Sequence, residues 1–506
     1  MAGPQVIDWT PRTLGAFLAT APRNAEALVT PTRRLAYGEL HESALRVARA
    51  MHALGLRKGD HAAILMGNDE VWLTLFYGAA LLGVVSVPVN TRFKAAELEF
   101  CLRQADCKAV FLAPKFLNND YAAMLREIRA PKLRHRIVLG EASWRKFAAG
   151  DRGQQISSKV KPDDLLLIQF TSGTTAYPKG VMLTHDSMLR NAWAAGERIG
   201  IRPEDRYFNC RPFFHVGGST LSALMALVHG ACLVTLPTFE AGAALAMMEA
   251  ERCTLTSGND TIFQLLMSHA DFPKRRLALR GGWAAAGAET MRKIIDVLGA
   301  KHICAAYGLS EASPNVVMSD WRDDEALRVQ GLATPLPGLH LRTVDGEIQV
   351  RGWSVMRGYY NNPQATAQAF TADGFLRTGD LGELHPGGRL KMIGRLKDVF
   401  RVGGENVAPA EVEEVLLAHP AVAVAQVVGV PDARLGEVPC AYVQLKAGQS
   451  AAPEMLLAWM KERAANFRVP RYLRIVPDFE AIGMTASGKV QKARLREHAM
   501  REFKLG

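Results

Sequence analysis

The sequence has little that would place the protein in a membrane or direct it out of the cell. Its longest apolar stretches, such as residues 78–89, fall well short of the ~18 to 20 residues that span a bilayer. Residues 1–18 lack a basic region followed by an apolar core, so we expect no signal peptide. Residues 504–506, Lys-Leu-Gly, are not a peroxisomal address. We therefore expect no integral membrane segment.

The sequence also lacks the patterns of metal-binding and nucleic-acid-binding proteins. Its seven cysteines are scattered and contain no Cys-x-x-Cys pair, so neither a metal cluster nor a disulfide framework is expected. A cytoplasmic location, where thiols stay reduced, fits best. The net charge is +11, but no long basic run is interleaved with aromatic residues, which argues against a nucleic-acid partner. The diffuse positive charge either favours anionic small molecules or is only a solvated surface.

What the sequence does have is a regular alternation of apolar strands and helices. A chain of 506 residues is too long for one ordinary core and predicts two or more domains. The alternation predicts an α/β fold with parallel layers. Strands are expected at residues 62–66, 84–89, 109–112, 137–139 and 165–170. Helices are expected at residues 71–82 and 95–104, and over most of 181–200.

The last third of the chain changes character twice. Residues 347–395 are rich in glycine and short apolar runs, which indicates a β-rich subdomain that closes the large unit. A second α/β pattern follows, with helices at 409–417 and 454–466 and strands at 422–430 and 440–445. We therefore expect a large N-terminal domain of layered α/β subdomains (1–394), a hinge (395–397) and a small mobile C-terminal α/β domain (398–506).

A loop rich in hydroxyl groups follows the strand at 165–170. It reads Thr-Ser-Gly-Thr-Thr-Ala-Tyr-Pro-Lys-Gly over residues 171–180. Hydroxyl donors, a close-approaching glycine backbone and a lysine are suited to holding phosphate, although the Walker A spacing is absent. The cluster alone would fit a polar surface loop equally well. The predicted nucleotide-binding residues of this loop are Thr171, Ser172, Gly173, Thr174, Thr175 and Lys179.

Several further motifs follow the loop in order along the chain. They are Pro212-Phe213-Phe214-His215-Val216-Gly217-Gly218, Tyr307-Gly308-Leu309-Ser310-Glu311, Arg377-Thr378-Gly379-Asp380, Gly394-Arg395-Leu396-Lys397-Asp398 and Thr485-Ala486-Ser487-Gly488-Lys489. Together with the loop they resemble the adenylate-forming superfamily, which includes acyl-CoA synthetases, peptide-synthetase adenylation domains and luciferases. The Phe-Phe-His string is more similar to acyl-CoA synthetases than to amino-acid adenylation domains.

The resemblance implies a reaction in two halves. A carboxylate attacks the α-phosphorus of ATP and gives an acyl-adenylate and pyrophosphate. A thiol, usually that of coenzyme A, then attacks the acyl carbon and releases AMP. Because a carboxylate and a triphosphate repel each other, catalysis must come from positioning and charge neutralisation, supplied by hydrogen-bond donors, Mg²⁺ and a lysine.

The resemblance also assigns roles within the ATP site. Glu311 would bind Mg²⁺ and Ser310 would donate to the α-phosphate, whereas without the motif Glu311 would be an ordinary surface glutamate. Tyr307 would stack on the adenine, its alternative being a core aromatic. Asp380 would accept hydrogen bonds from the ribose hydroxyls and Arg395 would contact the ribose; a surface salt bridge of Asp380 with an arginine is the alternative. The other side of the adenine would be formed by Gly287, Ala288 and Glu289, where Glu289 replaces the usual proline.

The C-terminal motifs imply a moving lysine. Lys489 would stabilise the developing charge in the adenylation step. It must leave before the thiol enters, so the small domain would rotate about a hinge at Lys397 or the next residue. Gly403 and Gly404 would then line the pantetheine channel of coenzyme A, although a β-turn would explain the same pair.

The acyl pocket is expected beside the Phe-Phe-His string. The resemblance places Phe214, His215, Val216 and Gly217 there, and leaves a core histidine as the alternative for His215. Asn259 and Asp260 stand where fatty-acid members have apolar residues. Because a buried aspartate must be hydrogen-bonded, paired or protonated, we hypothesise an acid with a polar group, or a short, cyclic or aromatic acid.

The sequence therefore predicts an ATP- and Mg²⁺-dependent ligase that joins a carboxylic acid (fatty, cyclic or aromatic) to coenzyme A. Two alternatives stay open: a stand-alone ligase that loads a carrier protein, and a catalytically silent binding homologue. A homodimer is left open as an assembly.

Overall fold

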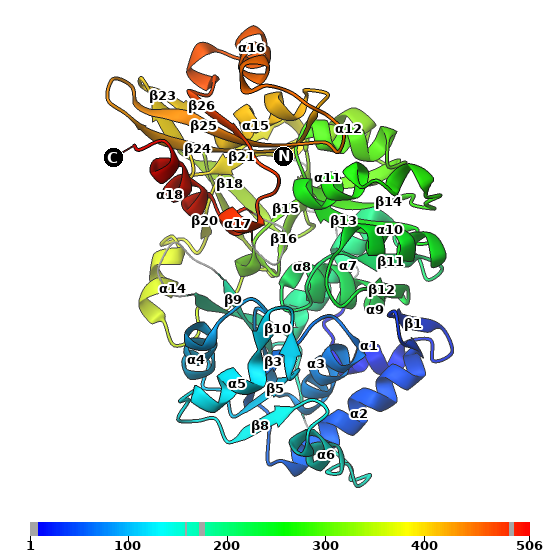
Figure 1. Ribbon diagram of the computed structural model, residues 1–506. Helices are drawn as coiled ribbons and strands as arrows, with labels where there is room; N and C mark the ends of the chain where they lie inside the picture. Colours follow the sequence, from blue (N-terminus) through cyan, green and yellow to red (C-terminus); the bar gives the residue numbers. More distant parts are fainter. Residues whose placement is uncertain (1–8, 157–158, 172–177, 485–489, 506) are drawn as a thin grey trace.

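The α/β class expected from the sequence is confirmed by the structure. The computed structural model describes residues 9–156, 159–171, 178–484 and 490–505 (Figure 1). Within these ranges the chain forms five β-sheets. The N-terminal sheets lie in the lower and middle parts of Figure 1, and the C-terminal sheet lies at the top.

The largest sheet has the order β17-β16-β15-β14-β13-β11-β12-β1-β2. Its strands β1 and β11 to β15 run parallel to one another. The pairs β1–β2, β15–β16 and β16–β17 are antiparallel. Their bounds are β1 Glu26–Val29, β2 Arg34–Ala36, β11 Arg206–Asn209, β12 Cys232–Thr235, β13 Leu255–Asn259, β14 Gly281–Ala285, β15 His302–Gly308, β16 Asn315–Met318 and β17 Thr334–Pro335.

The second sheet has the order β10-β9-β4-β3-β5-β8. All its neighbours are parallel except β9 and β10, which form an antiparallel pair. The strands are β3 His61–Leu65, β4 Val85–Pro88, β5 Ala109–Leu112, β8 His135–Val138, β9 Leu165–Thr171 and β10 Lys179–Thr184, and a small hairpin beside them is formed by β6 Lys115–Phe116 and β7 Asn119–Asp120.

Helices fill the space between these two sheets and cover their outer faces. Helix α7 contacts strands of both sheets, and α3 packs against α2 within the same buried cluster. The helices of this part are α1 Leu14–Thr20, α2 Tyr37–Ala53, α3 Glu70–Leu82, α4 Ala95–Gln104, α5 Tyr121–Glu127, α6 Ala142–Ala148, α7 His185–Ile199, α8 Val216–Gly218, α9 Met225–His229, α10 Ala241–Ala250, α11 Asp260–Ser268, α12 Ala288–Asp296, α13 Glu325–Val329 and α14 Pro363–Ala369. A single π-helical turn, Ser219–Leu224, joins α8 to α9.

One sequence expectation is wrong. Residues 181–184 do not begin a helix but complete strand β10, whose side chains at Val181 and Leu183 are fully buried. The helix begins only at His185, because the Thr184 side chain accepts a hydrogen bond from the Ser187 backbone and caps the helix there. The loop at 171–180 therefore joins two antiparallel strands rather than a strand and a helix.

The β-rich segment forms a separate antiparallel sheet, as expected. Its order is β18-β19-β20-β21, with bounds β18 His340–Val344, β19 Glu347–Arg351, β20 Leu376–His385 and β21 Arg389–Arg395. The Asp380–Arg395 pair belongs to the β20–β21 ladder, so the last residues of this sheet lie directly before the expected hinge.

The C-terminal residues have a hydrophobic core of their own. This core is built from Phe400 to Ala499, and no residue before Phe400 belongs to it among those the structure describes. The elements are β22 Phe400–Val402, β23 Glu405–Val407, α15 Pro409–Leu417, β24 Val422–Asp432, β25 Gly436–Leu445, α16 Pro453–Arg463, β26 Tyr472–Ile475, α17 Glu480–Gly483 and α18 Lys492–Glu502. The expected helices and strands of this region are all present: α15 has the expected ends, whereas one or both ends of β24, β25 and α16 are shifted.

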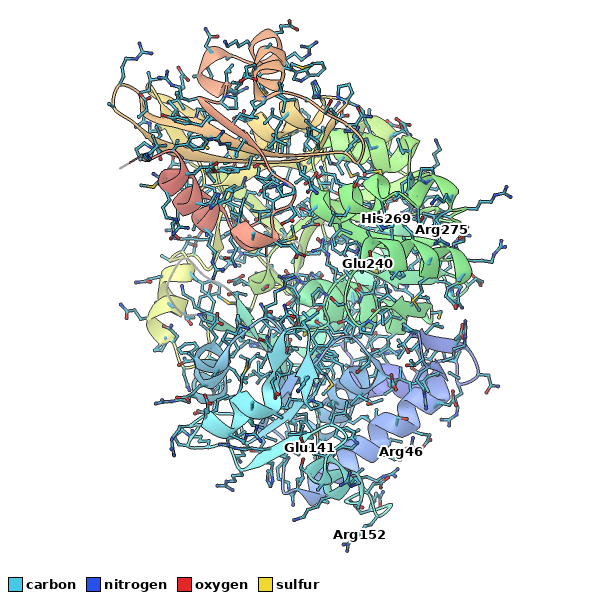
Figure 2. All side chains as sticks on the ribbon, in the orientation of Figure 1. Arg46, Glu141, Arg152, Glu240, His269 and Arg275 are labelled. Carbon is cyan, nitrogen blue, oxygen red and sulfur yellow. The ribbon has the colours of Figure 1, made fainter. Side chains whose placement is uncertain are left out.

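Few charged side chains are buried in the described part of the protein. Arg46, Glu141 and Arg152 are exposed at the end of the molecule farthest from the C-terminal unit (Figure 2). All seven cysteines are buried free thiols. Among the described helices, none is both long and apolar enough to cross a membrane.

A glycine in the centre of the largest sheet provides a test of this packing. Gly282 has φ +127°, and a Cβ there would lie 1.7 Å from the Thr256 carbonyl oxygen on β13. Gly282→Ala is expected to destabilise the protein by at least about 3 kcal/mol, because β13 must move. Thermal and urea denaturation measure this.

The matched control is Gly299→Ala, where φ is +83° but nothing lies within 4 Å of an added Cβ. Only the backbone strain of about 1 kcal/mol is expected there. Equal losses in the two variants would contradict the close approach of β13 and β14.

Candidate active site

The ends of the predicted phosphate loop are held by the β9–β10 ladder. Thr171 at the end of β9 pairs with Lys179 at the start of β10. The loop residues Ser172, Gly173, Thr174 and Thr175 lie outside the described residues. The ladder brings the two ends of the loop together, so that Lys179 lies at its base.

Lys179 is connected to Glu311 through an aromatic residue. Its ammonium lies 5.0 Å from the centre of the Tyr359 ring. The Tyr359 hydroxyl donates a hydrogen bond of 3.0 Å to Glu311 Oε1. The sequence analysis did not identify Tyr359, because nothing in the sequence shows that the segment after Gly358 returns to β10, where Tyr359 bridges to Val181.

Glu311 lies in a short 3-10 helix, Ser310–Ala312, that follows β15. The buried Asn191 on α7 fixes the chain just beyond it: its amide donates to the Asn315 carbonyl (2.8 Å) and accepts from the Asn315 N–H (3.1 Å). Gly308 is required before this turn, because an added Cβ would lie 2.1 Å from the Pro314 carbonyl oxygen. Glu311 and Ser310 are thus presented together on a short, well-anchored turn.

The residues present fit a Mg²⁺ ion that binds mainly through phosphate oxygens and water. Glu311 offers one partly buried carboxylate, and only its Oε1 is engaged by Tyr359. Among the described residues there is no cluster of three or more carboxylates, histidines or cysteines that could enclose a metal. Mg²⁺ is commonly bound in this way, through one or two carboxylates and the substrate phosphates.

Tyr307, Asp380 and Arg395 meet where β15 approaches the four-stranded sheet. The Tyr307 hydroxyl donates to Asp380 Oδ2 (2.8 Å), and Arg395 Nε lies 3.2 Å from Asp380 Oδ1. Asp380 is only 3% exposed. The salt bridge of Asp380 considered from the sequence therefore exists, with Arg395: the carboxylate is buried, whereas the Arg395 side chain is exposed. Burial also raises the pKa of Tyr307 well above its ordinary value, so the hydroxyl stays protonated and donates a hydrogen bond to Asp380.

Gly287 and Ala288 begin helix α12, and Asp260 holds this start in place. Asp260 Oδ1 accepts a hydrogen bond of 3.1 Å from the Gly287 N–H. Glu289 forms ion pairs within the helix, with Lys293 at 3.3 Å and Arg292 at 3.7 Å. Asp260 thus connects the end of β13 to the segment that was predicted to contact the adenine.

Asn259 and Asp260 have structural roles at the start of α11. The Asn259 side chain accepts from the Ile262 N–H (3.1 Å) and caps the helix. Burial raises the pKa of Asp260, with the Glu413 carboxylate adding to this effect and the hydrogen bonds from Thr290 and Gly287 opposing it. Because Glu413 lies on α15, the start of α11 faces the C-terminal unit.

The Phe-Phe-His segment forms the turn before α8. Phe214 is 7% exposed and Val216 is fully buried. The His215 Nδ1 accepts a hydrogen bond from the Gly217 N–H (3.0 Å) and caps α8. Gly218 is required here, because an added Cβ would lie 2.2 Å from the Pro212 carbonyl oxygen.

The C-terminal unit contacts the N-terminal sheets beside the predicted acyl pocket. Arg92, which follows β4, donates to the Met484 carbonyl (3.3 Å), and Lys293 on α12 donates to the Leu417 carbonyl (2.9 Å). Lys489 lies outside the described residues, but its flanking residues Met484 and Val490 are paired with each other. Figure 1 shows α17 on the side of the C-terminal unit that faces the N-terminal sheets.

The predicted hinge and channel residues lie at the edge of the C-terminal unit. Lys397 is exposed immediately after β21. Gly403 and Gly404 form the turn between β22 and β23, with φ +58° and +101°. The positive φ angles alone favour glycine at both positions, so the β-turn alternative accounts for the residue type.

This fold and site are those of an enzyme that binds adenine nucleotides. The protein family described as "AMP-binding enzyme" matches residues 16–360, and "AMP-binding enzyme C-terminal domain" matches residues 411–489. The chain therefore belongs to the AMP-binding enzyme family, and the resemblance drawn from its motifs is confirmed.

Known relatives cover nearly the whole chain. A 3-[(3aS,4S,7aS)-7a-methyl-1,5-dioxo-octahydro-1H-inden-4-yl]propanoyl:CoA ligase of Rhodococcus jostii is 36% identical over 494 residues, 92% of this chain and 94% of that protein. The mitochondrial medium-chain acyl-CoA ligase of Bos taurus is 32% identical over 551 residues, 98% of this chain and 88% of that protein.

Solved structures agree with this assignment. The anthranilate CoA ligase AuaEII in complex with anthranoyl-AMP superposes with a TM-score of 0.90 at 25% identity, over 98% of this chain and 99% of that one. ATP-bound MatB from Rhodopseudomonas palustris gives a TM-score of 0.84 at 27% identity, over 97% of this chain and all of that one.

The raised pKa of Asp260 predicts a pH dependence of stability. A carboxyl group whose pKa is raised on folding stabilises the folded state below its unfolded pKa, and this stabilisation is lost as the pH rises through the folded pKa. Asp260→Asn cannot ionise but keeps an acceptor for the Gly287 N–H. Relative to the parent, the variant should therefore gain thermal stability as the pH rises above about 4, the ordinary pKa of an aspartate.

The control for the change in net charge is Asp296→Asn, at an exposed residue that ends α12. If the thermal midpoint of Asp260→Asn follows that of the parent as the pH rises, the pKa of the carboxyl group is not perturbed by folding.

Proposed function

We propose that the protein activates a carboxylic acid with ATP as an acyl-adenylate and transfers the acyl group to coenzyme A, releasing AMP and pyrophosphate. The observation that carries this proposal is the Tyr307–Asp380–Arg395 group, built around a buried carboxylate, together with the Lys179–Tyr359–Glu311 group. Tyr307 at the end of β15 and Glu311 in the 3-10 helix that follows connect the two groups. The first suits a ribose and its adenine, and the second suits phosphates. Membership of the AMP-binding enzyme family and acyl-CoA ligase relatives support the same reaction.

In this proposal Asp380 accepts hydrogen bonds from the ribose hydroxyls. A carboxylate presents two acceptor oxygens, and Tyr307 and Arg395 each approach one of them. Those two bonds fix its orientation before ATP arrives. Tyr307 keeps its ring face for the adenine, while Gly287, Ala288 and Glu289 approach from the other side and Arg395 contacts the ribose.

Charge neutralisation at the phosphates falls to Lys179, the loop hydroxyls and Glu311. We assign Mg²⁺ to Glu311 and the α-phosphate contact to Ser310. When bound, Mg²⁺ supplies positive charge that offsets the repulsion between the triphosphate and the incoming carboxylate. Tyr359 orients Glu311 through the hydrogen bond from its hydroxyl to Oε1, and the Lys179 ammonium lies over the face of the same ring.

The C-terminal unit would supply the second half of the site. We propose domains at 1–394 and 398–506 with a hinge at Lys397, a division supported by the separate core that begins at Phe400. The Arg92–Met484 contact favours an arrangement in which Lys489 reaches the acid and phosphate oxygens. After rotation about the hinge, Gly403 and Gly404 would border the entering coenzyme A.

The acid is proposed to occupy the space beside Phe214, His215, Val216 and Gly217, with Asn259 and Asp260 shaping one end. The names of the relatives range from a medium-chain acyl-CoA ligase to a ligase for a bicyclic acid with two oxo groups. A carrier-protein acceptor in place of coenzyme A is the second candidate. We also propose a cytoplasmic location, in keeping with seven free thiols.

The reaction is tested by following pyrophosphate release with a panel of acids, and then acyl transfer to free coenzyme A. Lys489→Ala should lower acid-dependent pyrophosphate release by about 10²- to 10³-fold, because it removes charge stabilisation in the transition state. It should leave transfer from synthetic acyl-adenylate to coenzyme A largely intact.

Lys461→Ala, at an exposed residue of α16, is the control for loss of one positive charge. Adenylate formation without any transfer to coenzyme A would reject the coenzyme A ligase and favour a carrier-protein acceptor. No pyrophosphate release with any acid would reject the proposed function.

The role of Tyr359 is tested separately. Tyr359→Phe keeps the ring beneath Lys179 but removes the hydrogen bond to Glu311. We expect kcat to fall by about 10-fold or more and the Mg²⁺ requirement to rise, since a hydrogen bond to a charged group contributes about 1.5–3 kcal/mol. An unchanged Mg²⁺ dependence would show that Tyr359 does not position Glu311. Tyr360→Phe, at the neighbouring tyrosine that bonds to Asp106, is the matched control.

A further inference from the structure

Arg211, between β11 and the Phe-Phe-His turn, is a buried arginine without a counter-charge. The residue is 4% exposed, and its Nε has no hydrogen-bond acceptor. Among the described residues no ion pair or side-chain hydrogen bond to its guanidinium is formed. A buried guanidinium in this state is costly unless something else provides an acceptor.

The groups around Arg211 do not compensate its charge. Its guanidinium carbon lies 5.1 Å from the centre of the Trp283 ring, and the nearest titratable groups are Cys210 and Tyr207. Burial raises the pKa of Cys210 to about 11 and raises that of Tyr207 still further, so both are neutral at physiological pH. Burial also lowers the pKa of Arg211, but an arginine remains charged.

Arg211 belongs to a group of buried donors on one face of the largest sheet. Ser257 on β13 pairs with Trp283 on β14, and the Tyr207 hydroxyl lies beside both. Guanidinium and indole N–H groups can only donate, whereas hydroxyls both donate and accept. The Tyr207 and Ser257 hydroxyls and the Trp283 indole lie close enough to serve one another as partners. Arg211 Nε has no acceptor among the described residues, so Arg211 is the member of the group that needs an oxygen acceptor from outside the chain.

The position of Arg211 points to the substrate. Its backbone is fixed by Asn209 and Asn68, which both donate to the Arg211 carbonyl (2.7 and 2.8 Å). Its Cδ lies 3.4 Å from where a Cβ would stand on Gly217, a residue of the proposed acyl pocket. Arg211 and Phe214 also line one cavity. Arg211 thus borders the space assigned to the acyl chain.

We infer that Arg211 binds a second oxygen-bearing group of the substrate acid, a carboxylate or a ketone distant from the carboxyl group that is activated. Arg211 is then a specificity-determining residue. This inference rests on the proposed function and names the class of acid that it uses. A carboxylate would also neutralise the buried charge, and a ketone would satisfy the donors alone.

The test compares plain acids, oxo acids with a terminal methyl ketone and α,ω-dicarboxylic acids of equal chain length, over about four to ten carbons. Pyrophosphate release gives kcat/KM for each acid. The parent protein should prefer an oxygenated acid over the plain acid of the same length. A higher kcat/KM for the dicarboxylic acid indicates that the acceptor is a carboxylate. A higher kcat/KM for the oxo acid indicates that it is a ketone.

Arg211→Met should reduce kcat/KM for the preferred oxygenated acid by about 10²-fold or more and leave that for the plain acid within about threefold, because only the former loses its hydrogen bonds. The control is Arg190→Met, since Arg190 also stacks on a tryptophan and has a buried Nε without an acceptor. That variant should affect all acids equally.

Equal losses for plain and oxygenated acids in Arg211→Met, or a parent preference for plain acids at every length, would overturn the inference. Binding is followed independently as the rise in thermal midpoint caused by each acid. If no acid supports pyrophosphate release, the proposed function fails, but a midpoint rise specific to oxygenated acids and lost in Arg211→Met would still support this role of Arg211. No acid-specific rise in that case would overturn both.

Discussion

The buried carboxylate of Asp380 is the contact on which the candidate site depends. It receives Tyr307 from the largest sheet and Arg395 from the end of the four-stranded sheet. A carboxylate this buried is tolerated only because both of its oxygens are engaged, one by a hydroxyl and one by a guanidinium. The same contact fixes the position of β21, the strand after which the chain enters the C-terminal unit. In the proposed function, nucleotide recognition and domain geometry therefore share one electrostatic interaction.

At the phosphate end of the site, the difficulty is an excess of negative charge. A triphosphate and a carboxylate can react only where their repulsion is offset, and this requires cations on fixed supports. Tyr359 provides such a support, since its ring lies beneath Lys179 and its hydroxyl bonds to Glu311. Lys179 and Glu311, which belong to separate sequence motifs, are thus connected by Tyr359, which no motif contains.

The sequence predicted what depends on local pattern. Helix α4 and helix α15 begin and end where the hydrophobic period and the N-terminal turn signals place them. Strand β10 was missed because its short apolar run merges with the helix that follows, and only the Thr184 cap separates them. The partners of Asp380, Glu311 and Arg211 come from distant segments, and their pairing arises from tertiary packing that periodicity does not report.

The two ends of the site therefore differ in how completely the protein satisfies them. At the nucleotide end, Asp380 and Glu311 each have protein partners, so the geometry is set before ATP binds. At the proposed acyl end, Arg211 retains a buried donor that no described residue accepts. An unsatisfied donor in a buried pocket penalises an apolar occupant more strongly than it favours a polar one, because the donor must give up water in either case. With the inferred role of Arg211, the pocket discriminates mainly by rejection, so the chemistry of the acid is determined by what the pocket lacks rather than by its size.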